Sequence, residues 1–420
     1  MNILLIGNDG RSSALEWALH KSVFVKSIKR VPGSMDMSEC VWCDSLTHTG
    51  KALLSRFAGV KEIDFVVIGP EAPLVAGVAD VYRRFGKVVF GPSKRAAELE
   101  GSKVAAKLFC RAYDIPTADF DSAETPEQAK AYIRKRDVPV VVKADGLAGG
   151  KGVQVAKMLE EAYTAIDTFS KLPAGRRLVI EERLIGWECS YIVLTDGVNF
   201  VPLPAVRDYK TTYAGSMVNT GGMGCATLPS HLFTPALEQQ IQKTILVPTL
   251  TALRNEGRPF TGALYLGLMI EGGRPYVLEF NCRFGDPETQ TVLPLLGEGH
   301  DLFPFLYATT NGTMSYRLSP FTPYNPRHSV CVVLAAAGYP QQPRSGDVII
   351  GLEEARHMEN VYIFDAGTSR TPDGITLTKG GRVLNVVGTG KTLESARQNA
   401  YKAAHKIHFD GMWYREDIGL

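Results

Sequence analysis

The sequence predicts an α/β protein that opens with a parallel sheet. Within the first hundred residues, apolar segments of strand length alternate with helical patterns, and each apolar segment ends in a glycine-bearing turn. The predicted strands are 1–6, 64–68 and 88–90, and the predicted helices are 12–21, 51–58 and 75–85. Strands that alternate with helices form parallel sheets, whose ligands bind beyond the carboxyl ends of the strands. The turns expected at that edge are 7–11, 69–74 and 91–94.

From about residue 101 the pattern indicates antiparallel pairing. The segments that predict a small lid-like module are a helix at 102–113, strands at 138–143, 153–156 and 177–182, and a helix at 159–169. The segments that predict a larger sheet beside it are strands 191–195, 200–202, 261–270 and 275–281, with a long helix at 235–256.

The last hundred residues predict a mostly β domain with one helix. A stretch rich in proline and polar residues, 310–327, is typical of a linker. The segments expected after it are strands 330–336, 347–350, 362–366 and 382–388 and a helix at 392–407. The expected domains are 1–100, 101–320 with a lid over about 118–190, and 321–420.

Composition narrows the class of function. The chain has 420 residues, too many for one core, and its net charge is only +2, with scattered basic residues. This balance gives no sign of a nucleic-acid partner or a membrane surface, and no apolar stretch approaches the roughly 18 residues of a membrane span. Of seven cysteines, only Cys40 and Cys43 form a C-x-x-C pair, which does not complete a zinc site. Free thiols and a cytoplasmic location are therefore expected.

A glycine-rich loop with two lysines is the first candidate site. Lys143 closes a predicted strand and begins K-A-D-G-L-A-G-G-K-G-V, which contains a second lysine, Lys151. Its glycines allow backbone N–H groups to approach phosphate oxygens, and the two lysines can neutralise a polyphosphate. The loop opens a strand rather than a helix, so it is not a P-loop. A glycine hairpin with two solvated lysines is the alternative interpretation.

The end of the next strand is a second candidate site. Glu181 and Glu182 end that strand, and Leu184 and Glu188 follow it. Free main-chain groups at a strand end can bind an adenine edge, and a carboxylate a few residues later can bind ribose hydroxyls. A solvated acidic surface is the alternative.

The segment V-L-E-F-N-C-R-F-G-D-P-E gives the sharpest signal. Because side chains alternate along a strand, Glu279 and Asn281 share one face, while Leu278 and Phe280 are expected in the core. A carboxylate and an amide oxygen two residues apart suit a Mg²⁺ ion that bridges nucleotide phosphates. Arg283 can then clamp a carboxylate or a transferring phosphoryl group. The alternative is a salt-bridge network on an edge strand.

A second glycine loop, N-T-G-G-M-G at 219–224, follows Asp208 and Lys210. Its backbone donors suit a small anionic substrate, and a plain turn is the alternative. A nicotinamide-dependent oxidoreductase is a competing function, because the chain starts with a strand, a glycine and a helix. The segment 7–13, however, lacks the spacing of G-x-G-x-x-G.

Taken in order, these segments resemble the ATP-grasp superfamily and, within it, the phosphoribosylamine–glycine ligases. The similarity runs essentially end to end. The motifs that carry it are G-P-E-A-P-L, G-P-S-K, L-E-G-S-K, the lysine–glycine loop, N-T-G-G-M-G, E-F-N-C-R-F-G-D-P-E-T-Q, G-Y-P, G-G-R-V-L and the final D-I-G. The resemblance implies an N-terminal pre-ATP-grasp domain, an ATP-grasp fold with a small mobile lid, and a mostly β C-terminal domain with a helix.

The resemblance also implies a reaction. ATP would phosphorylate glycine, and 5-phosphoribosylamine would attack the glycyl phosphate, giving glycinamide ribonucleotide, ADP and phosphate in de novo purine biosynthesis. Mg²⁺ or Mn²⁺ would assist, and the chain would be a monomer or weak homodimer. Such catalysis is mostly positioning and charge neutralisation.

Roles for individual residues follow from the same resemblance. The residues implied to bind nucleotide are Lys107, Lys143 and Lys151 at phosphates, Glu181, Glu182 and Leu184 at adenine, and Glu188 at ribose. The implied metal ligands are Glu279 and Asn281, and the implied catalytic residues are Arg283, Asp286 and Lys151. The residues implied to bind glycine and its acyl phosphate are Asp208, Lys210, Asn219, Thr220, Gly221, Gly222, Met223 and Arg283. Those implied for the amine are Gly10, Arg11, Ser12 and Glu71.

Two loops of the first domain depart from the family pattern. Where the family usually has G-G-R-E-H-A, this chain has D-G-R-S-S-A at 9–14, and P-G-S-M-D-M at 32–37 replaces P-G-N-x-G-T. Ser12 and Ser13 still offer donors at a helix N-terminus, which is compatible with a phosphate. A paralogue that acts on a different phosphorylated amine, or one with impaired catalysis, is therefore the alternative function.

Overall fold

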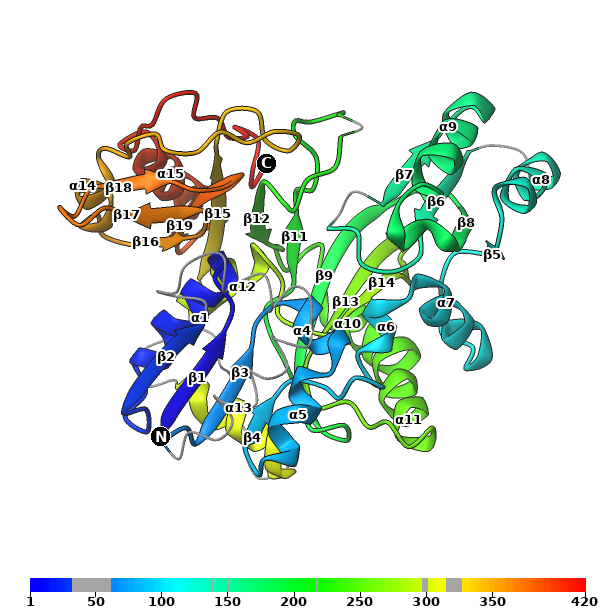
Figure 1. The fold of residues 1–420 in the computed structure, drawn as a ribbon, viewed down its shortest axis with the longest axis horizontal. Helices are drawn as coiled ribbons and strands as arrows, with labels where there is room; N and C mark the ends of the chain where they lie inside the picture. The colour runs from blue at the N-terminus through cyan, green and yellow to red at the C-terminus, as the bar shows by residue number, and fades with distance from the viewer. Residues whose placement is uncertain (32–61, 137–138, 150–151, 217, 297–300, 315–326) are drawn as a thin grey trace.

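The computed structural model describes residues 1–31, 62–136, 139–149, 152–216, 218–296, 301–314 and 327–420. Lys151, the departing loop 32–37 and the predicted helix 51–58 lie outside these residues. The described part divides into a parallel sheet, a small antiparallel sheet and a large sheet that runs across the molecule between them (Figure 1).

The N-terminal sheet is parallel, as predicted, with strand order β2-β1-β3-β4. Its elements are β1 (Asn2–Ile6), α1 (Gly10–His20), β2 (Ser27–Val31), β3 (Phe65–Ile68), α4 (Glu71–Ala76), α5 (Val78–Arg84) and β4 (Val88–Phe90). The single helix expected at 75–85 is divided into two, because Gly77 takes a φ of 91° that most residues avoid. Strand β2 escaped the sequence analysis because this edge strand buries little apolar surface.

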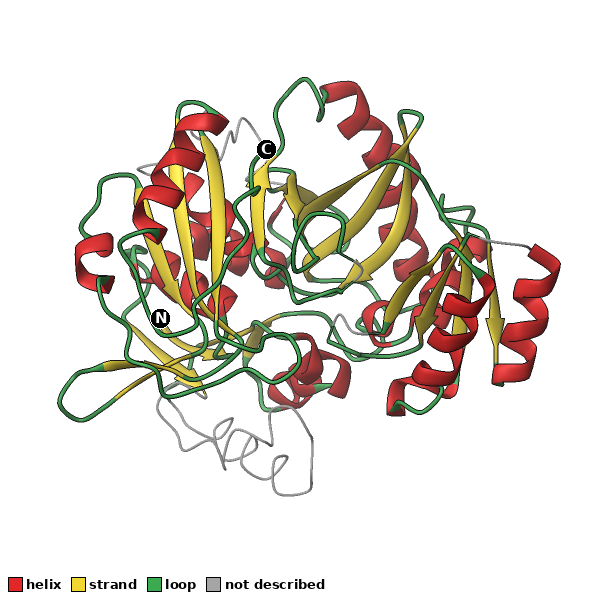
Figure 2. Cartoon of the chain, turned by 90° about the horizontal axis from the view of Figure 1, so that it is seen from above, coloured by secondary structure: helices red, strands yellow, loops and turns green. Residues whose placement is uncertain are grey.

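The lid-like module is a four-stranded antiparallel sheet of order β5-β8-β6-β7. Its strands and helices lie together at one end of the molecule (Figure 2). Its elements, with the two helices that precede them, are α6 (Glu98–Gly101), α7 (Lys103–Ala112), β5 (Phe120–Ala123), α8 (Pro126–Arg136), β6 (Val140–Ala144), β7 (Val153–Ala156), α9 (Leu159–Phe169) and β8 (Leu178–Glu182). Helices α8 and α9 bury Ile133 and Ile166 against the sheet. The sequence analysis did not anticipate β5 and α8.

The largest sheet has nine strands in the order β14-β13-β9-β11-β12-β15-β19-β16, with β10 on β9. Its strands before residue 320 are β9 (Trp187–Thr195), β10 (Phe200–Pro202), β11 (Val206–Asp208), β12 (Gly224–Thr227), β13 (Gly262–Glu271) and β14 (Arg274–Asn281). The helices of this part are α10 (Pro235–Ile241) and α11 (Val247–Asn255), joined by a π-helical turn, then α12 (Glu288–Val292) and α13 (Leu302–Asn311).

Three of the C-terminal strands extend this same sheet, because β15 pairs with β12, and two others form a separate hairpin. The elements here are β15 (His328–Ala335), α14 (Leu352–Arg356), β16 (Val361–Asp365), β17 (Thr368–Arg370), β18 (Thr376–Thr378), β19 (Arg382–Gly390) and α15 (Leu393–Ala404). The strand predicted at 347–350 is wrong: only isolated bridges form, from Val348 to Leu377 and from Ile350 to His408. Both Val348 and Ile350 are exposed, so their apolar character misled the prediction.

One hydrophobic core joins the N-terminal sheet to the large sheet. Leu5 and Leu15 share it with Val292 and Phe303, and the rings of Phe90 and Phe284 stack at 5.7 Å. Because the core is continuous, the carboxyl edge of the parallel sheet is held against the segment that follows β14.

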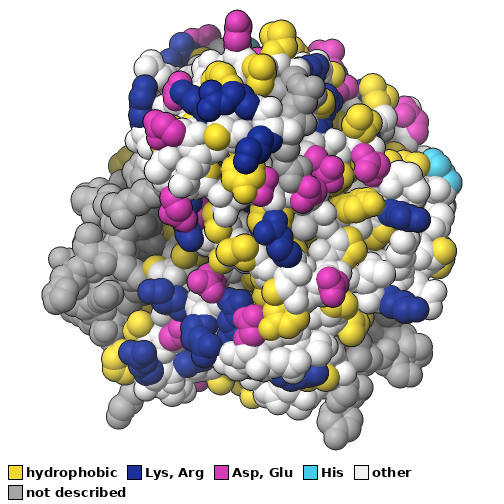
Figure 3. Space-filling model, turned by 90° about the vertical axis from the view of Figure 1, so that its right-hand side faces the viewer, with side chains coloured by type: hydrophobic (Ala, Val, Ile, Leu, Met, Phe, Trp, Pro, Cys, Tyr) yellow, Lys and Arg dark blue, Asp and Glu magenta, His cyan; other side chains and the backbone are white. Residues whose placement is uncertain are grey.

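Acidic and basic side chains are intermixed on the face that carries α8 and α9 (Figure 3). Among the described residues, no helix is both long and apolar enough to cross a membrane.

Candidate functional site

Two buried lysines lie where the lid meets the large sheet. Lys107 on α7 and Lys143 on β6 both face the carboxylate of Glu181 on β8, at 3.2 and 2.9 Å. All three side chains are at most 8% exposed. Burial lowers the pKa of Lys107 to about 8, although the negative charge of Glu181 acts to raise it. Two cations share one anion here, so the pair keeps a positive excess that suits a polyphosphate.

A bulge in β14 positions Lys143 against the large sheet. The register of β13 with β14 passes from Gly267↔Glu279 to Leu268↔Val277, so Leu278 is the extra residue. The prediction that Leu278 enters the core is therefore wrong: it is half-buried, and Val277 and Phe280 take the core positions. The freed carbonyl of Leu278 accepts a hydrogen bond from Lys143 Nζ at 3.1 Å.

The predicted metal ligands Glu279 and Asn281 lie beyond the bulge. Lys210 Nζ lies 3.3 Å from Glu279 and 3.7 Å from Glu188. Lys210, followed by Lys143, Lys103 and Arg283, lowers the pKa of Glu279 to about 2, so this carboxylate is charged. The side chain is 35% exposed, and it remains accessible from solvent.

Arg283 links β14 to the N-terminal sheet. Its guanidinium donates to Asn281 Oδ1 at 2.9 Å and to Glu71 Oε2 at 3.1 Å, and it pairs with Glu100 at 3.1 Å. Burial would raise the pKa of Glu71, but Arg283 and Arg11 outweigh it and lower the pKa to about 2. Burial raises the pKa of Glu100 to about 7. Arg283, the predicted clamp, therefore lies between Glu71, whose pKa is lowered, and Glu100, whose pKa is raised.

Buried acidic groups form a second cluster around the loop 219–224. Glu288 Oε1 accepts from Tyr265 at 2.7 Å, and Asp286 Oδ2 pairs with the guanidinium of Arg382 at 3.4 Å, while Asp208 Oδ1 is buried and accepts no hydrogen bond from the described residues. Burial, then repulsion from Glu288, raises the pKa of Asp208 well above its ordinary value. A Cβ on Gly222 would come within 2.8 Å of Asp208 Oδ1, so only glycine fits here. Buried carboxylate oxygens without donors suit a cationic group.

The loop itself is tied at several points. Asn219 donates to the carbonyl of Val153 at 3.2 Å, and Thr220 Oγ1 donates to the carbonyl of Lys210 at 2.9 Å. Met223, predicted among the substrate-binding residues, is a fully buried core side chain. The loop therefore has a lid contact at one end and core packing at the other.

At the carboxyl edge of the parallel sheet lies Ser12, which was expected to offer hydrogen-bond donors to a phosphate. Asp9 caps α1, and its Oδ1 accepts from both the N–H and the hydroxyl of Ser12, at 2.9 and 2.7 Å. Its other oxygen pairs with Arg11 at 2.6 Å. Both Ser12 donors are thus already bonded to a carboxylate at the helix N-terminus. Gly10 packs closely on the side-chain amide of Asn385, which would have to move to admit a Cβ, since that atom would lie 2.2 Å from Asn385 Nδ2.

The structure brings most of the predicted residues together and leaves some apart from them. Glu182 is exposed and its Oε1 accepts the N–H of Asp119, while Leu184 is half-buried just after the strand. Residues that the sequence analysis did not assign a role are Glu100, Ser190, Tyr265, Glu288 and Arg382. Glu288 closes the quoted D-P-E motif, Glu100 lies in L-E-G-S-K and Arg382 in G-G-R-V-L, so these three could have been found there. Ser190 and Tyr265 sit on β9 and β13 and carry no local signal.

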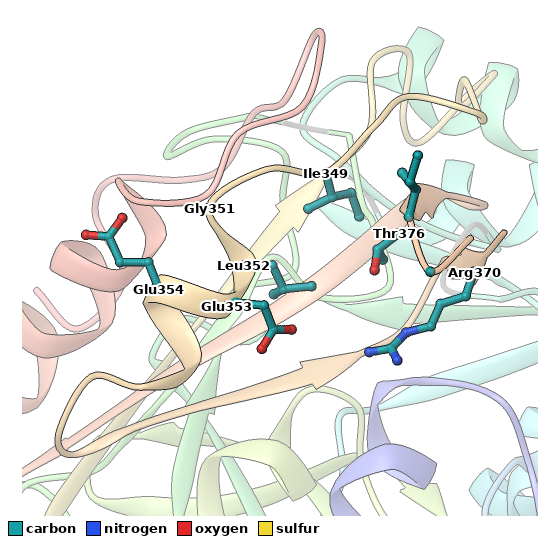
Figure 4. Close-up of a pocket in the computed structure, with 9 residues that line it drawn as sticks. Ile349, Gly351, Leu352, Glu353, Glu354, Arg370 and Thr376 are labelled. Atoms are coloured by element: carbon teal, nitrogen blue, oxygen red, sulfur yellow. The ribbon is translucent and has the colours of Figure 1, made fainter. Parts of the chain in front are cut away.

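A separate cavity of about 410 Å³ lies between α14 and the β17–β18 hairpin (Figure 4). Leu352, Glu353 and Arg370 are among its lining residues. None of the predicted site residues lines it, so it is distinct from the lysine–carboxylate site.

Comparison with known proteins decides the family. Three family models of phosphoribosylglycinamide synthetase match the chain in order: the N domain at 1–100, the ATP-grasp (A) domain at 101–289 and the C domain at 329–420. A phosphoribosylamine–glycine ligase of Neisseria meningitidis serogroup B is 43% identical over 424 residues, spanning 100% of this chain and 98% of that protein. The chain belongs to the phosphoribosylglycinamide synthetase family. The oxidoreductase alternative is thereby excluded.

Other relatives of the phosphoribosylglycinamide synthetase family cover the same length. A phosphoribosylamine–glycine ligase of Rhodopirellula baltica is 41% identical, across 99% of this chain and 97% of its own. The crystal structure of the Thermotoga maritima phosphoribosylamine–glycine ligase superposes with a TM-score of 0.79 at 36% identity, covering 99% of this chain and all of that one. An L-amino acid ligase from Bacillus licheniformis, with a TM-score of 0.65 at 15% identity, shares the fold.

Proposed function

We propose that this chain ligates glycine to 5-phosphoribosylamine with ATP, in purine biosynthesis. The observation that carries the proposal is identity of 41–44% to phosphoribosylamine–glycine ligases along the whole chain. The convergence of Lys107, Lys143, Glu279 and Arg283 at the lid boundary supplies the chemistry such a reaction needs.

The reaction consists of two displacements. A carboxylate oxygen of glycine bonds to the γ-phosphorus of ATP as the bond to ADP breaks. The amine nitrogen then bonds to the carbonyl carbon of glycyl phosphate, phosphate leaves, and the nitrogen gives up a proton. The products are glycinamide ribonucleotide, ADP and phosphate. Neither step requires a protein nucleophile, so the side chains act by holding reactants and neutralising charge.

The nucleotide is proposed to lie between the lid and the large sheet. Lys107 and Lys143, with Lys151, would hold its phosphates, because both described lysines are buried with only one carboxylate between them. The strand end at Glu181 and Glu182, with Leu184, would bind adenine. Glu188 would bind ribose; its side chain is 44% exposed.

Glu279 and Asn281 fit a divalent cation of the Mg²⁺ or Mn²⁺ kind. Glu279 is ionised and both groups offer hard oxygen donors on one face. Two protein ligands would leave the remaining coordination positions of such an ion to phosphates and water. When bound, the ion would neutralise phosphate charge; Lys210 and Arg283 now hold the two ligands in place.

Glycine is proposed to bind beside the loop 219–224, with Asn219, Thr220, Gly221, Gly222 and Met223 shaping the site. The unpartnered oxygen of Asp208 would receive its ammonium group, and Arg283 its carboxylate. Lys210 would stay paired with Glu279. The amine is proposed to approach from Gly10, Arg11, Ser12 and Glu71, on the other side of Arg283.

The remaining expectations stay proposals. Three units of 1–100, 101–320 with a lid at about 118–190, and 321–420 are proposed, together with a monomer or weak homodimer. A cytoplasmic location is supported by the five described cysteines, which are free and buried.

The direct test is to incubate the purified protein with ATP, Mg²⁺, glycine and freshly made 5-phosphoribosylamine. ADP release and glycinamide ribonucleotide, identified by mass, are expected only when all are present. No ADP release above a control without the amine would refute the assignment. Release with another phosphorylated amine alone would favour the paralogue.

A further inference from the structure

Arg382 extends the glycine site into the C-terminal part of the sheet. It is the first residue of β19 and has a side chain only 20% exposed. Its position is set by a three-strand ladder. Strand β12 begins at Gly224, the last residue of the glycine loop, and pairs with β15, which pairs with β19. Strand β19 lies two strands from β12 in the sheet (Figure 1), and the side chain of Arg382 reaches back to the loop.

The contacts of Arg382 join two loops that are distant in sequence. Its Nη1 donates to the carbonyl of Gly221 at 2.5 Å and to the carbonyl of Asp286 at 2.8 Å. Its Nη2 lies 3.4 Å from the carboxylate of Asp286, which is 6% exposed. The planar fork of arginine allows all three contacts at once, which a lysine could not reproduce.

A second group from the same side holds the other end of the Gly221 peptide. The hydroxyl of Tyr339 accepts the N–H of Gly221 at 3.0 Å. The ring of Tyr339 packs on Gly381, where a Cβ would come within 2.1 Å of it. Gly221 is therefore held by hydrogen bonds at both its N–H and its carbonyl.

The geometry points to Arg382 as a positioning residue for the glycine subsite, acting through Gly221 and Asp286 with Tyr339 as its accessory. This inference rests on the proposed function. Arg382 holds the backbone of the glycine loop and the carboxylate of Asp286 at a fixed separation. Lys107 and Lys143 lie on the lid side, and among the described contacts neither of them touches Arg382. Loss of the Arg382 guanidinium should therefore weaken glycine binding without weakening ATP binding to the same extent.

The test compares R382K with R344K as the matched control. Arg344 also contacts two carboxylates, those of Asp347 and Asp410, but it is exposed and lies elsewhere on the C-terminal part. Displacement of the loop by about 1 Å in R382K should raise the KM for glycine on the order of 10- to 100-fold. The KM for ATP should change less than about threefold in R382K, and both constants should stay at wild-type values in R344K.

Y339F supplies a second, milder variant, which removes only the acceptor of the Gly221 N–H. It should raise the KM for glycine in the same direction by a smaller factor, and it decides the question if R382K does not fold. An unchanged KM for glycine, or an equal rise in the KM for ATP, would overturn the inference. Wild-type protein is assayed first: if it releases no ADP, the proposed function fails, whereas turnover with unaffected variants refutes the role of Arg382 alone.

Discussion

Replacing Glu181 by glutamine should destabilise the nucleotide-free protein and strengthen its response to ATP. Glu181 is the shared counterion of Lys107 and Lys143, and its side chain is 2% exposed. Removing the negative charge leaves two buried ammonium groups without an anion. Breaking a buried pair costs about 3–5 kcal/mol, and glutamine can still accept one hydrogen bond, so about 3 kcal/mol is expected.

The expected loss in the free energy of unfolding can be converted to a change in the melting temperature, Tm. An unfolding entropy of about 2.1 cal/mol/K per residue gives about 0.9 kcal/mol/K for the 420 residues, if they unfold together. A loss of about 3 kcal/mol then lowers Tm by about 3 °C. ATP supplies the missing negative charge, so its stabilising effect should be larger in the variant than in the wild type.

The assay is thermal unfolding with no ligand, with Mg²⁺–ATP and with adenosine, which has no phosphates. E354Q is the control, because Glu354 pairs with Lys406 at the surface, where an ion pair contributes about 1 kcal/mol or less. An E181Q protein that melts like the wild type, or one whose response to ATP does not exceed that of the wild type, would refute the counterion role. If adenosine also stabilises E181Q more than it stabilises the wild type, the phosphates of ATP are not the cause of the larger response.

Three further outcomes are expected. Because the pKa of Lys107 is about 8, its positive charge is lost as the pH rises through that value. The kcat/KM for ATP should fall with an apparent pKa near 8, and a K107R variant that retained this fall would contradict the assignment. E279Q should fold, since the side chain is 35% exposed, but lose at least about 100-fold in turnover; undiminished turnover would eliminate the metal-ligand role. D9N keeps an N-cap but removes a negative charge next to Ser12 and Arg11. It should lower the KM for the amine if the phosphate approaches this edge, and steady-state kinetics showing a higher KM would place the phosphate elsewhere.

The strands and motifs were predictable wherever local pattern and burial agree. Strands such as 153–156 and 200–202 were predicted with their observed bounds, because each is a short apolar run between turns. The strand predicted at 347–350 failed since Val348 and Ile350 are apolar yet exposed. Leu278 was misplaced because a bulge interrupts the alternation of β14, and a bulge depends on the partner strand.

The sequence by itself determined the fold class, the order of the elements and the residue types that could handle phosphate and metal. Those properties follow from local periodicity, glycine spacing and the chemistry of side chains within one segment. Only the tertiary structure decided the partners: Glu181 between Lys107 and Lys143, and Arg382 on the loop 219–224. It also showed that Asp9 already bonds both donors of Ser12. The physical reason is that charge pairing acts through space between elements brought together by folding, and spacing along one strand or helix does not record it.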